Sequence, residues 1–284
     1  MTNKKSDLKE SRLLLDSKHI TPTIYNIKVV EVGDYTQVYL YENKKKVTCN
    51  DNDDFNLTSL KTKEILNSFD EEKENHKEIK LSNKIEQRSI IRSKIECQRL
   101  AKANISSWKT FITLTFSDNV TSIEDANKRF RYFTDKVRRV KKDFKYLCIT
   151  EFQKRGAIHY HLLTNVSIND DKLLFTQEDN PKFKHIKYWL DGFTSIEEIK
   201  DDPQKIVGYI SKYMTKDIDN RLFSHRRYFS SMNLIKPSVS YLNSDTEIGQ
   251  YYYKKIIQDK QLIYDNQYIN VYDNTKVTFL EYLK

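Results

Sequence analysis

Two histidines separated by a single residue are the strongest candidates for chemistry in this sequence. They are His159 and His161, in the run Ile158–Leu162 (IHYHL). Alternate residues of a β-strand point to the same face, so in a strand both imidazoles can reach one ion. Most isolated pairs of this kind are surface histidines on an ordinary strand. A metal site therefore needs a further ligand.

The residues before this run predict a hairpin. Tyr146–Phe152 and Ala157–Thr164 have the composition of paired strands, and the short loop between them ends in Gly156. A three-residue hairpin loop commonly ends in a left-handed residue, and glycine adopts that conformation without steric cost. The pattern thus predicts an antiparallel pair with a loop of Lys154, Arg155 and Gly156.

The register of this hairpin supplies the further ligand. Pairing across the loop sets Glu151 opposite His159, on the same face as both histidines. Two imidazoles and one carboxylate leave open positions on a divalent cation that must also hold a substrate oxygen. Non-haem iron oxygenases use the same ligand set, so an oxygenase remains an alternative at this point.

A second candidate is a helix with two phenols, Gly208–Lys216 (GYISKYMTK). At about 100° per residue, one stripe of this helix carries Tyr209, Lys212, Tyr213 and Lys216. A phenol with a pKa near 10 is a poor nucleophile, and a neighbouring ammonium group favours the phenolate and stabilises charge in a phosphoryl transition state. The chain has 19 tyrosines, so an amphipathic surface helix is the alternative.

Several elements must position these side chains. Lys109–Phe116 predicts a buried strand, and Ser122 with Asp125 predicts the start of a helix with a basic outer face. Asp202 and Pro203 predict the start of the tyrosine helix.

The remaining segments are predicted more coarsely. Residues 23–41 predict two strands around Gly33-Asp34, and residues 59–107 predict helix, in which 75–83 could be a loop. A loop is predicted near 169–184, a basic aromatic connection over 220–236, and strands over 238–271.

Composition sets limits on the class of protein. The 284 residues suit one main core with extensions, and the net charge of +9 suits a polyanionic partner. The sequence has no apolar run of membrane-spanning length and no apolar secretion signal, which predicts a cytoplasmic protein without a membrane partner. Three widely spaced cysteines predict reduced thiols rather than a disulfide framework or a zinc cluster.

Taken in chain order, these motifs resemble the HUH-superfamily rolling-circle replication initiators (Rep proteins) of plasmids and single-stranded DNA phages, in their double-tyrosine, phage-type branch. The resemblance rests on the strand Phe111–Phe116, on Glu151 with Arg155–His161, on the helix Tyr209–Lys216 and on the basic segment Arg226–Pro237. It covers just under half of the chain. The sequence has no GxxxxGK[ST] phosphate-binding loop, so a helicase would come from the host.

The resemblance implies an α+β fold, with a central antiparallel sheet, flanking helices and the histidines on the middle strand. It implies that Glu151, His159 and His161 hold Mg²⁺ or Mn²⁺ on the scissile phosphate of single-stranded or supercoiled origin DNA. A tyrosine then forms a 5′-phosphotyrosine and frees a 3′-hydroxyl for a host polymerase. Either Tyr209 or Tyr213 can act first, and a Tyr-x-x-Lys-Asp pattern slightly favours Tyr213. Candidate DNA contacts are Lys154, Arg155, Arg226, Arg227 and Tyr228.

The sequence therefore predicts three parts. These are an N-terminal extension over residues 1–107, a nicking endonuclease core over 108–237 and a β-rich C-terminal extension over 238–284. A relaxase or transposase could use the same chemistry, but relaxases generally have three histidines and an early tyrosine, and single-strand transposases are usually shorter. A catalytically silent origin-binding regulator is the alternative from another class.

Overall fold

The computed structural model describes residues 24–47, 77–153, 155–177, 180–200, 206, 208, 225–270 and 273–284. The chain forms two compact units. One unit combines the chain up to Asn75 with Pro237–Lys284, and the other is His76–Lys236. No helix in the described part of the chain has the length and apolar character needed to cross a membrane.

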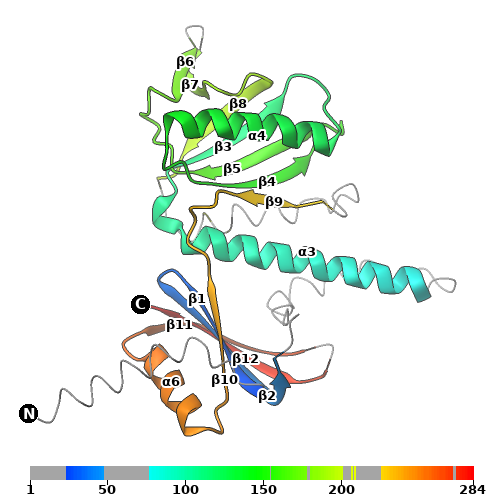
Figure 1. The fold of residues 1–284 in the computed structure, drawn as a ribbon, viewed down its shortest axis with the longest axis vertical. Helices are drawn as coiled ribbons and strands as arrows, with labels where there is room; N and C mark the ends of the chain where they lie inside the picture. Colours follow the sequence, from blue (N-terminus) through cyan, green and yellow to red (C-terminus); the bar gives the residue numbers. More distant parts are fainter. Residues whose placement is uncertain are drawn as a thin grey trace, which may run out of the picture. The chain divides into compact units, whose positions relative to one another are not determined.

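The unit His76–Lys236 is built on a five-stranded antiparallel sheet with strand order β8-β3-β5-β4-β9 (Figure 1). The predicted α+β class is thereby confirmed, and the strand that carries the histidines, β5, is central. The strands are β3 (Thr110–Phe116), β4 (Tyr146–Phe152), β5 (Ile158–Thr164), β8 (Gly192–Glu198) and β9 (Tyr228–Ser230).

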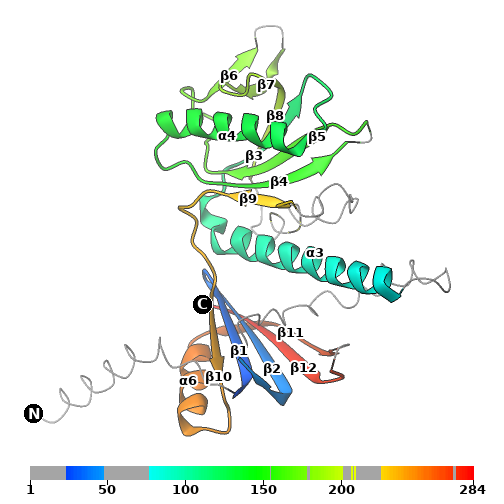
Figure 2. The ribbon, with the colours of Figure 1, turned by 45° about the vertical axis from the view of Figure 1, so that its right-hand side comes forward.

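Helix α4 (Ile123–Val140) covers one face of this sheet (Figures 1 and 2). The predicted cap is present, because the Ser122 hydroxyl accepts a hydrogen bond from the Asp125 amide at 3.3 Å. The helix buries an apolar stripe against alternate residues of the strands. The residues of that stripe are Ala126, Phe130, Phe133 and Val137.

Helix α3 (Lys77–Ala103) packs on the opposite face of the sheet. Its Cys97 and Ala101 lie in one apolar cluster with strand residues of that face, and the Trp108 indole donates to the Ala101 carbonyl at 2.8 Å. The sequence prediction placed this helix in an N-terminal extension ending at residue 107. The structure differs, because the apolar side of α3 is buried against the core strands and belongs to the same unit.

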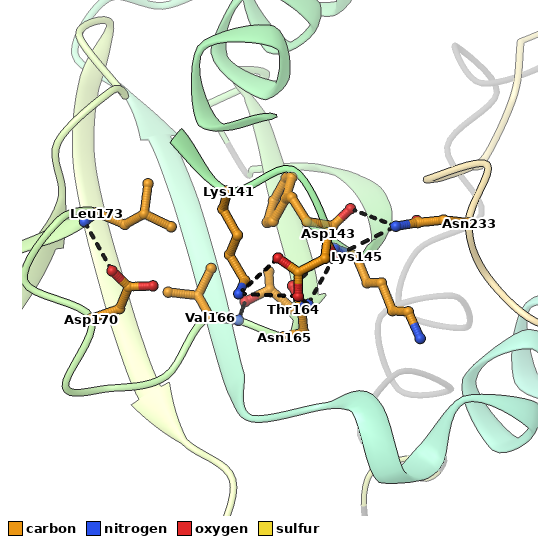
Figure 3. A network of polar contacts seen from close by, with 10 residues as sticks. Lys141, Asp143, Lys145, Thr164, Asn165, Val166, Asp170, Leu173 and Asn233 are labelled. Atoms are coloured by element: carbon orange, nitrogen blue, oxygen red, sulfur yellow. Dashed lines mark hydrogen bonds and ion pairs between the residues drawn. The ribbon is translucent and has the colours of Figure 1, made fainter. Parts of the chain in front are cut away.

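A polar network fixes the connection between α4 and β4 (Figure 3). The Asn165 side chain accepts from the Lys145 amide at 2.8 Å and donates to the Asp143 carbonyl at 2.9 Å. Asn233, which follows β9, donates to the Phe144 carbonyl at 3.3 Å. The start of β4 is thereby held beside the end of β5, which supports the register of the whole hairpin.

The predicted loop near residues 169–184 is wrong. This region forms a hairpin of β6 (Leu174–Gln177) and β7 (Asn180–Ile186). Leu173, Leu174 and Ile186 are buried in the core under α4, and this burial stabilises strands that the local sequence pattern does not indicate.

In the other unit, segments from both ends of the chain form one five-stranded sheet with order β10-β1-β2-β12-β11. The strands are β1 (Ile24–Val32), β2 (Tyr35–Lys46), β10 (Ser238–Leu242), β11 (Gln261–Ile269) and β12 (Lys276–Leu283). The predicted turn at Gly33 is confirmed, with φ of 62°. Because β2 pairs with β12, as at Val38 and Leu280, the two predicted extensions belong to one unit.

The prediction of strands throughout residues 238–271 is also wrong in part, because Glu247–Ile257 forms helix α6. Thr246 caps this helix by accepting a hydrogen bond from the Gly249 amide at 3.0 Å. Tyr253, Ile256 and Ile257 recur at helical spacing and pack on the sheet, so the cap and this apolar stripe outweigh the strand preference of tyrosine and isoleucine.

Candidate active site

The candidate site lies on the face of β5 that carries the two histidines, which we call the histidine face. His161 is 5% exposed and His159 is half-buried, while Tyr160 between them points into the core under α4. The predicted alternation along the strand is therefore confirmed.

The predicted hairpin register is also confirmed, since Glu151 pairs with His159 across β4 and β5. Gly156 has φ of 89°, in the left-handed region that the loop requires. The Gln153 amide donates to the Ala157 carbonyl at 2.8 Å and closes the loop.

Glu151 contacts His161 diagonally across the hairpin. His161 Nε2 lies 2.6 Å from Glu151 Oε2, and His161 Nδ1 lies 3.2 Å from Thr113 Oγ1. The Phe111 ring stacks on the imidazole with centroids 5.8 Å apart. His161 is therefore held at both ring nitrogens and along one ring face, which fixes its orientation.

The third predicted ligand lies beside this pair. The ring centroids of His159 and His161 are 6.1 Å apart and the ring planes are inclined by 68°. In the described residues, no three His, Cys, Asp or Glu groups surround one point closely enough to hold a metal ion. Glu151 and His161 point their donor atoms at each other, so a shared ion requires both to turn toward it. Two imidazoles and a carboxylate on one face remain a suitable donor set for a divalent cation.

The histidine face consists of three cross-strand rows, which change from apolar to polar along the strands. The first row is Glu197, Phe111, Leu163 and Leu147, and α3 packs on its apolar members. The second row is Ser195, Thr113, His161, Ile149 and Tyr228. The third row is Phe193, Thr115, His159 and Glu151. The polar chemistry is thus concentrated at the end of the sheet away from the apolar α3 contacts.

The predicted DNA contacts have different environments. Arg155 is exposed, with its Nε donating to Gln153 Oε1 at 2.8 Å and its Nη2 to the Phe116 carbonyl at 3.2 Å. Arg226 is exposed, and the Arg227 carbonyl accepts from the Thr150 amide at 3.3 Å. Lys154 lies outside the described residues. The contacts of these residues with DNA stay predictions.

Tyr228 has a packing role in the structure. Its ring packs against the apolar cluster of the histidine face, and its hydroxyl donates to Glu96 of α3 at 3.2 Å. Burial raises the pKa of the Tyr228 phenol, and the neighbouring Glu96 carboxylate raises it further, so the hydroxyl keeps its proton. Stacking of DNA bases on Tyr228 stays a prediction.

The predicted nucleophiles Tyr209 and Tyr213, with Lys212 and Lys216, lie outside the described residues. Two nearby positions of the same predicted helix are described, and both Ile206 and Gly208 are helical. Ile206 is buried in the cluster that contains Ile149 and Leu163, on the histidine face. This segment therefore enters its helix on the same side of the sheet as Glu151 and His161.

Sequence reasoning missed the partners that orient His161. Thr113 and Phe111 lie on β3, which pairs with β5, and strand alternation would have identified them once that pairing was known. Glu96 lies on a helix that the sequence assigned to a different part of the chain.

Comparisons with known proteins indicate the class of protein. Residues 109–218 match the family model of replication-associated proteins of the ORF2 type. This match spans the sheet from β3 onward, both histidines and the predicted tyrosine helix. It supports a replication-initiator family and a role in DNA replication.

A curated relative points in the same direction. The chain is 28% identical over 127 residues to the phasyl DNA replicon protein arp of Escherichia coli. The matched part is 39% of this chain and 44% of the relative, so the chain matches less than half the length of that protein. No solved structure matches the chain.

Proposed function

We propose that the protein nicks and rejoins one strand of origin DNA through a covalent tyrosine intermediate, and so initiates rolling-circle replication. The observation that carries this proposal is the cluster on the histidine face, where Glu151 lies 2.6 Å from His161 and pairs in register with His159. Its position within a match to replication-associated proteins gives the cluster a DNA substrate.

The chain's own residues divide the work. Glu151, His159 and His161 would hold Mg²⁺ or Mn²⁺, which when bound supplies positive charge to the scissile phosphate. Thr113 and Phe111 orient His161, so that the imidazole is in place before substrate arrives. Lys212 and Lys216 favour the phenolate forms of Tyr209 and Tyr213.

One phenolate attacks phosphorus while the bond to the 3′ oxygen breaks, and that oxygen leaves as the hydroxyl that primes synthesis. The DNA whose 5′ phosphate lies at the break remains joined to tyrosine. The second phenol can repeat the transfer when the origin is regenerated. Arg155 and Arg226, both exposed, would bind flanking phosphates. A host helicase and polymerase would act on the nicked strand.

The experiment uses the full-length protein, Mn²⁺ and single-stranded oligonucleotides that tile the DNA around its own gene. Each oligonucleotide is labelled at the 3′ end in one set and at the 5′ end in the other. The 3′ label should become attached to protein in a form that resists SDS. The 5′ label should appear on a shorter, protein-free strand with a free 3′-hydroxyl.

Substitutions test the assignments separately. The double variant Y209F/Y213F should lose the adduct, while His161→Ala and Glu151→Gln should slow its formation about 10³-fold, as expected for lost charge stabilisation of several kcal/mol. His185→Ala is a matched control, because His185 also contacts a threonine hydroxyl but through Thr194, which is not on the histidine face. An adduct that persists in Y209F/Y213F would refute the tyrosine assignment.

Calorimetry separates this function from a catalytically silent origin-binding protein. Titration with Mn²⁺ should give binding heat in the wild type and in His185→Ala, and little in His161→Ala. DNA binding without any adduct, together with Mn²⁺ heat that does not depend on His161, would favour the silent protein.

A further inference from the structure

Phe193 is an exposed aromatic residue in the same row as the candidate site. It lies on the edge strand β8, is 66% exposed, and pairs with Thr115, which in turn pairs with His159. With about 4.8 Å between neighbouring strands, the Phe193 backbone lies about 10 Å from that of His159 and about 14 Å from that of Glu151. Single exposed apolar residues are common on protein surfaces, so the position of Phe193 is what is informative.

The surroundings of Phe193 form an open floor of short hydroxyl side chains. Thr113 and Thr115 are half-buried, and Ser195 is exposed beside Thr113. On the other side of β8, Ile196 packs against the core under α4. The strand therefore buries the side toward α4 and leaves Phe193 and Ser195 accessible on the histidine face.

The backbone that presents Phe193 is held firmly. A Cβ atom at Gly192 would lie 2.2 Å from the Thr115 carbonyl oxygen, so the strand can start this close to β3 only with glycine. The Ser117 amide donates to the Asp191 carbonyl at 2.9 Å, and Arg129 of α4 binds the Asp191 carboxylate at 3.0 Å. The Trp189 indole donates to the Thr115 carbonyl at 3.1 Å. An aromatic residue on such a backbone is pre-organised for binding.

We propose that Phe193, with the threonine floor beside it, stacks on an unpaired base of the DNA strand next to the scissile phosphate. This inference rests on the proposed function for the identity of the phosphate. Aromatic side chains bind single-stranded DNA by stacking, and a base in a duplex is not available for that contact. The threonine and serine hydroxyls can donate hydrogen bonds to the sugar-phosphate backbone.

Charge around Phe193 selects the direction of the strand. Glu197 and Glu198 are exposed farther along β8 and repel a phosphate chain that follows the strand. At the other end, the exposed Arg155 bonds to the carbonyl of Phe116, whose partner on β8 is Gly192. DNA therefore crosses the sheet along the third row, from Phe193 toward His159, with a cation at that end.

The experiment measures the affinity of the full-length protein for a fluorescent oligothymidylate without divalent metal. Loss of one stacked base should weaken binding about 5- to 150-fold in Phe193→Ala. Phe193→Leu should be weakened as well, because it keeps apolar volume without a ring to stack. Phe193→Trp should bind at least as tightly as wild type. Leu190→Ala is the matched control, because Leu190 is 79% exposed just before β8 and outside the row, and it should bind like wild type.

Each outcome supports or overturns the inference independently of the nicking chemistry. Equal affinity of Phe193→Ala and wild type overturns it, even when the wild type forms the tyrosine adduct. Weak binding in the Ala and Leu variants with restoration in Trp supports it, even when no adduct forms and the proposed function fails. Unchanged affinity with an altered mass in light scattering would instead assign Phe193 to a protein contact. A wild type that does not bind oligothymidylate also overturns it.

Discussion

Tyr160 provides a direct test of which side chains serve the site and which serve the core. It lies between the two histidines in sequence but is fully buried on the face covered by α4. Its hydroxyl donates to Asn127 Oδ1 at 2.8 Å, and its ring lies 4.7 Å from the Phe130 ring. Substitution should therefore change stability and leave the chemistry of the histidine face unchanged.

The structure gives different magnitudes for two substitutions. Tyr160→Phe removes one hydrogen bond whose acceptor, on the half-buried Asn127, can be solvated again, and should cost about 1 kcal/mol. Tyr160→Ala also removes a buried ring and should cost about 3–5 kcal/mol. With an m-value of about 1–3 kcal/mol per molar urea, Tyr160→Phe should lower the urea midpoint by about 0.3–1 M.

Tryptophan fluorescence is a suitable probe for this unit. The chain has 2 tryptophans, Trp108 and Trp189, both buried in His76–Lys236 and on opposite faces of its sheet. Tyr132→Phe is the control, because Tyr132 is 54% exposed on α4 and its substitution should leave the midpoint unchanged. A Tyr160→Phe protein with normal stability but weakened Mn²⁺ binding would refute the assignment of faces.

Three further substitutions or treatments test other parts of the fold. Asn104→Ala should destabilise by about 2–3 kcal/mol in urea unfolding, because the buried side chain bonds both the amide and the carbonyl of Ile235 at 2.9 Å; an unchanged midpoint would contradict this role. Burial raises the pKa of the Cys97 and Cys148 thiols, so in a Cys49→Ser background alkylation at pH of about 8.5 should stay slow until urea unfolds the protein, and rapid labelling of native protein would refute their burial. Gly192→Ala should cost about 1–3 kcal/mol and displace β8, seen as altered hydrogen exchange at the β3 amides, whereas unchanged exchange would contradict the close approach.

Much of the candidate site is determined locally in the sequence. Gly156 defines the loop, the loop fixes the register of β4 and β5, and strand alternation then sets Glu151, His159 and His161 on one face. Helix α4 is predictable for a similar reason, because Ser122 and the apolar stripe from Ala126 to Val137 lie within one continuous segment. In both cases the decisive interactions join residues that are close along the chain.

Only the tertiary structure decided the features that depend on distant segments. Pairing of β2 with β12 joins residues more than two hundred positions apart, so local patterns carry no signal that the ends of the chain share a sheet. The same is true of α3, whose place on the core depends on burial of Cys97 and Ala101. Strand β8 pairs with β3 across most of the unit, and that pairing alone brings Phe193 into the row of His159. Sequence thus determined the residues of the candidate centre, and long-range strand pairing determined their neighbours.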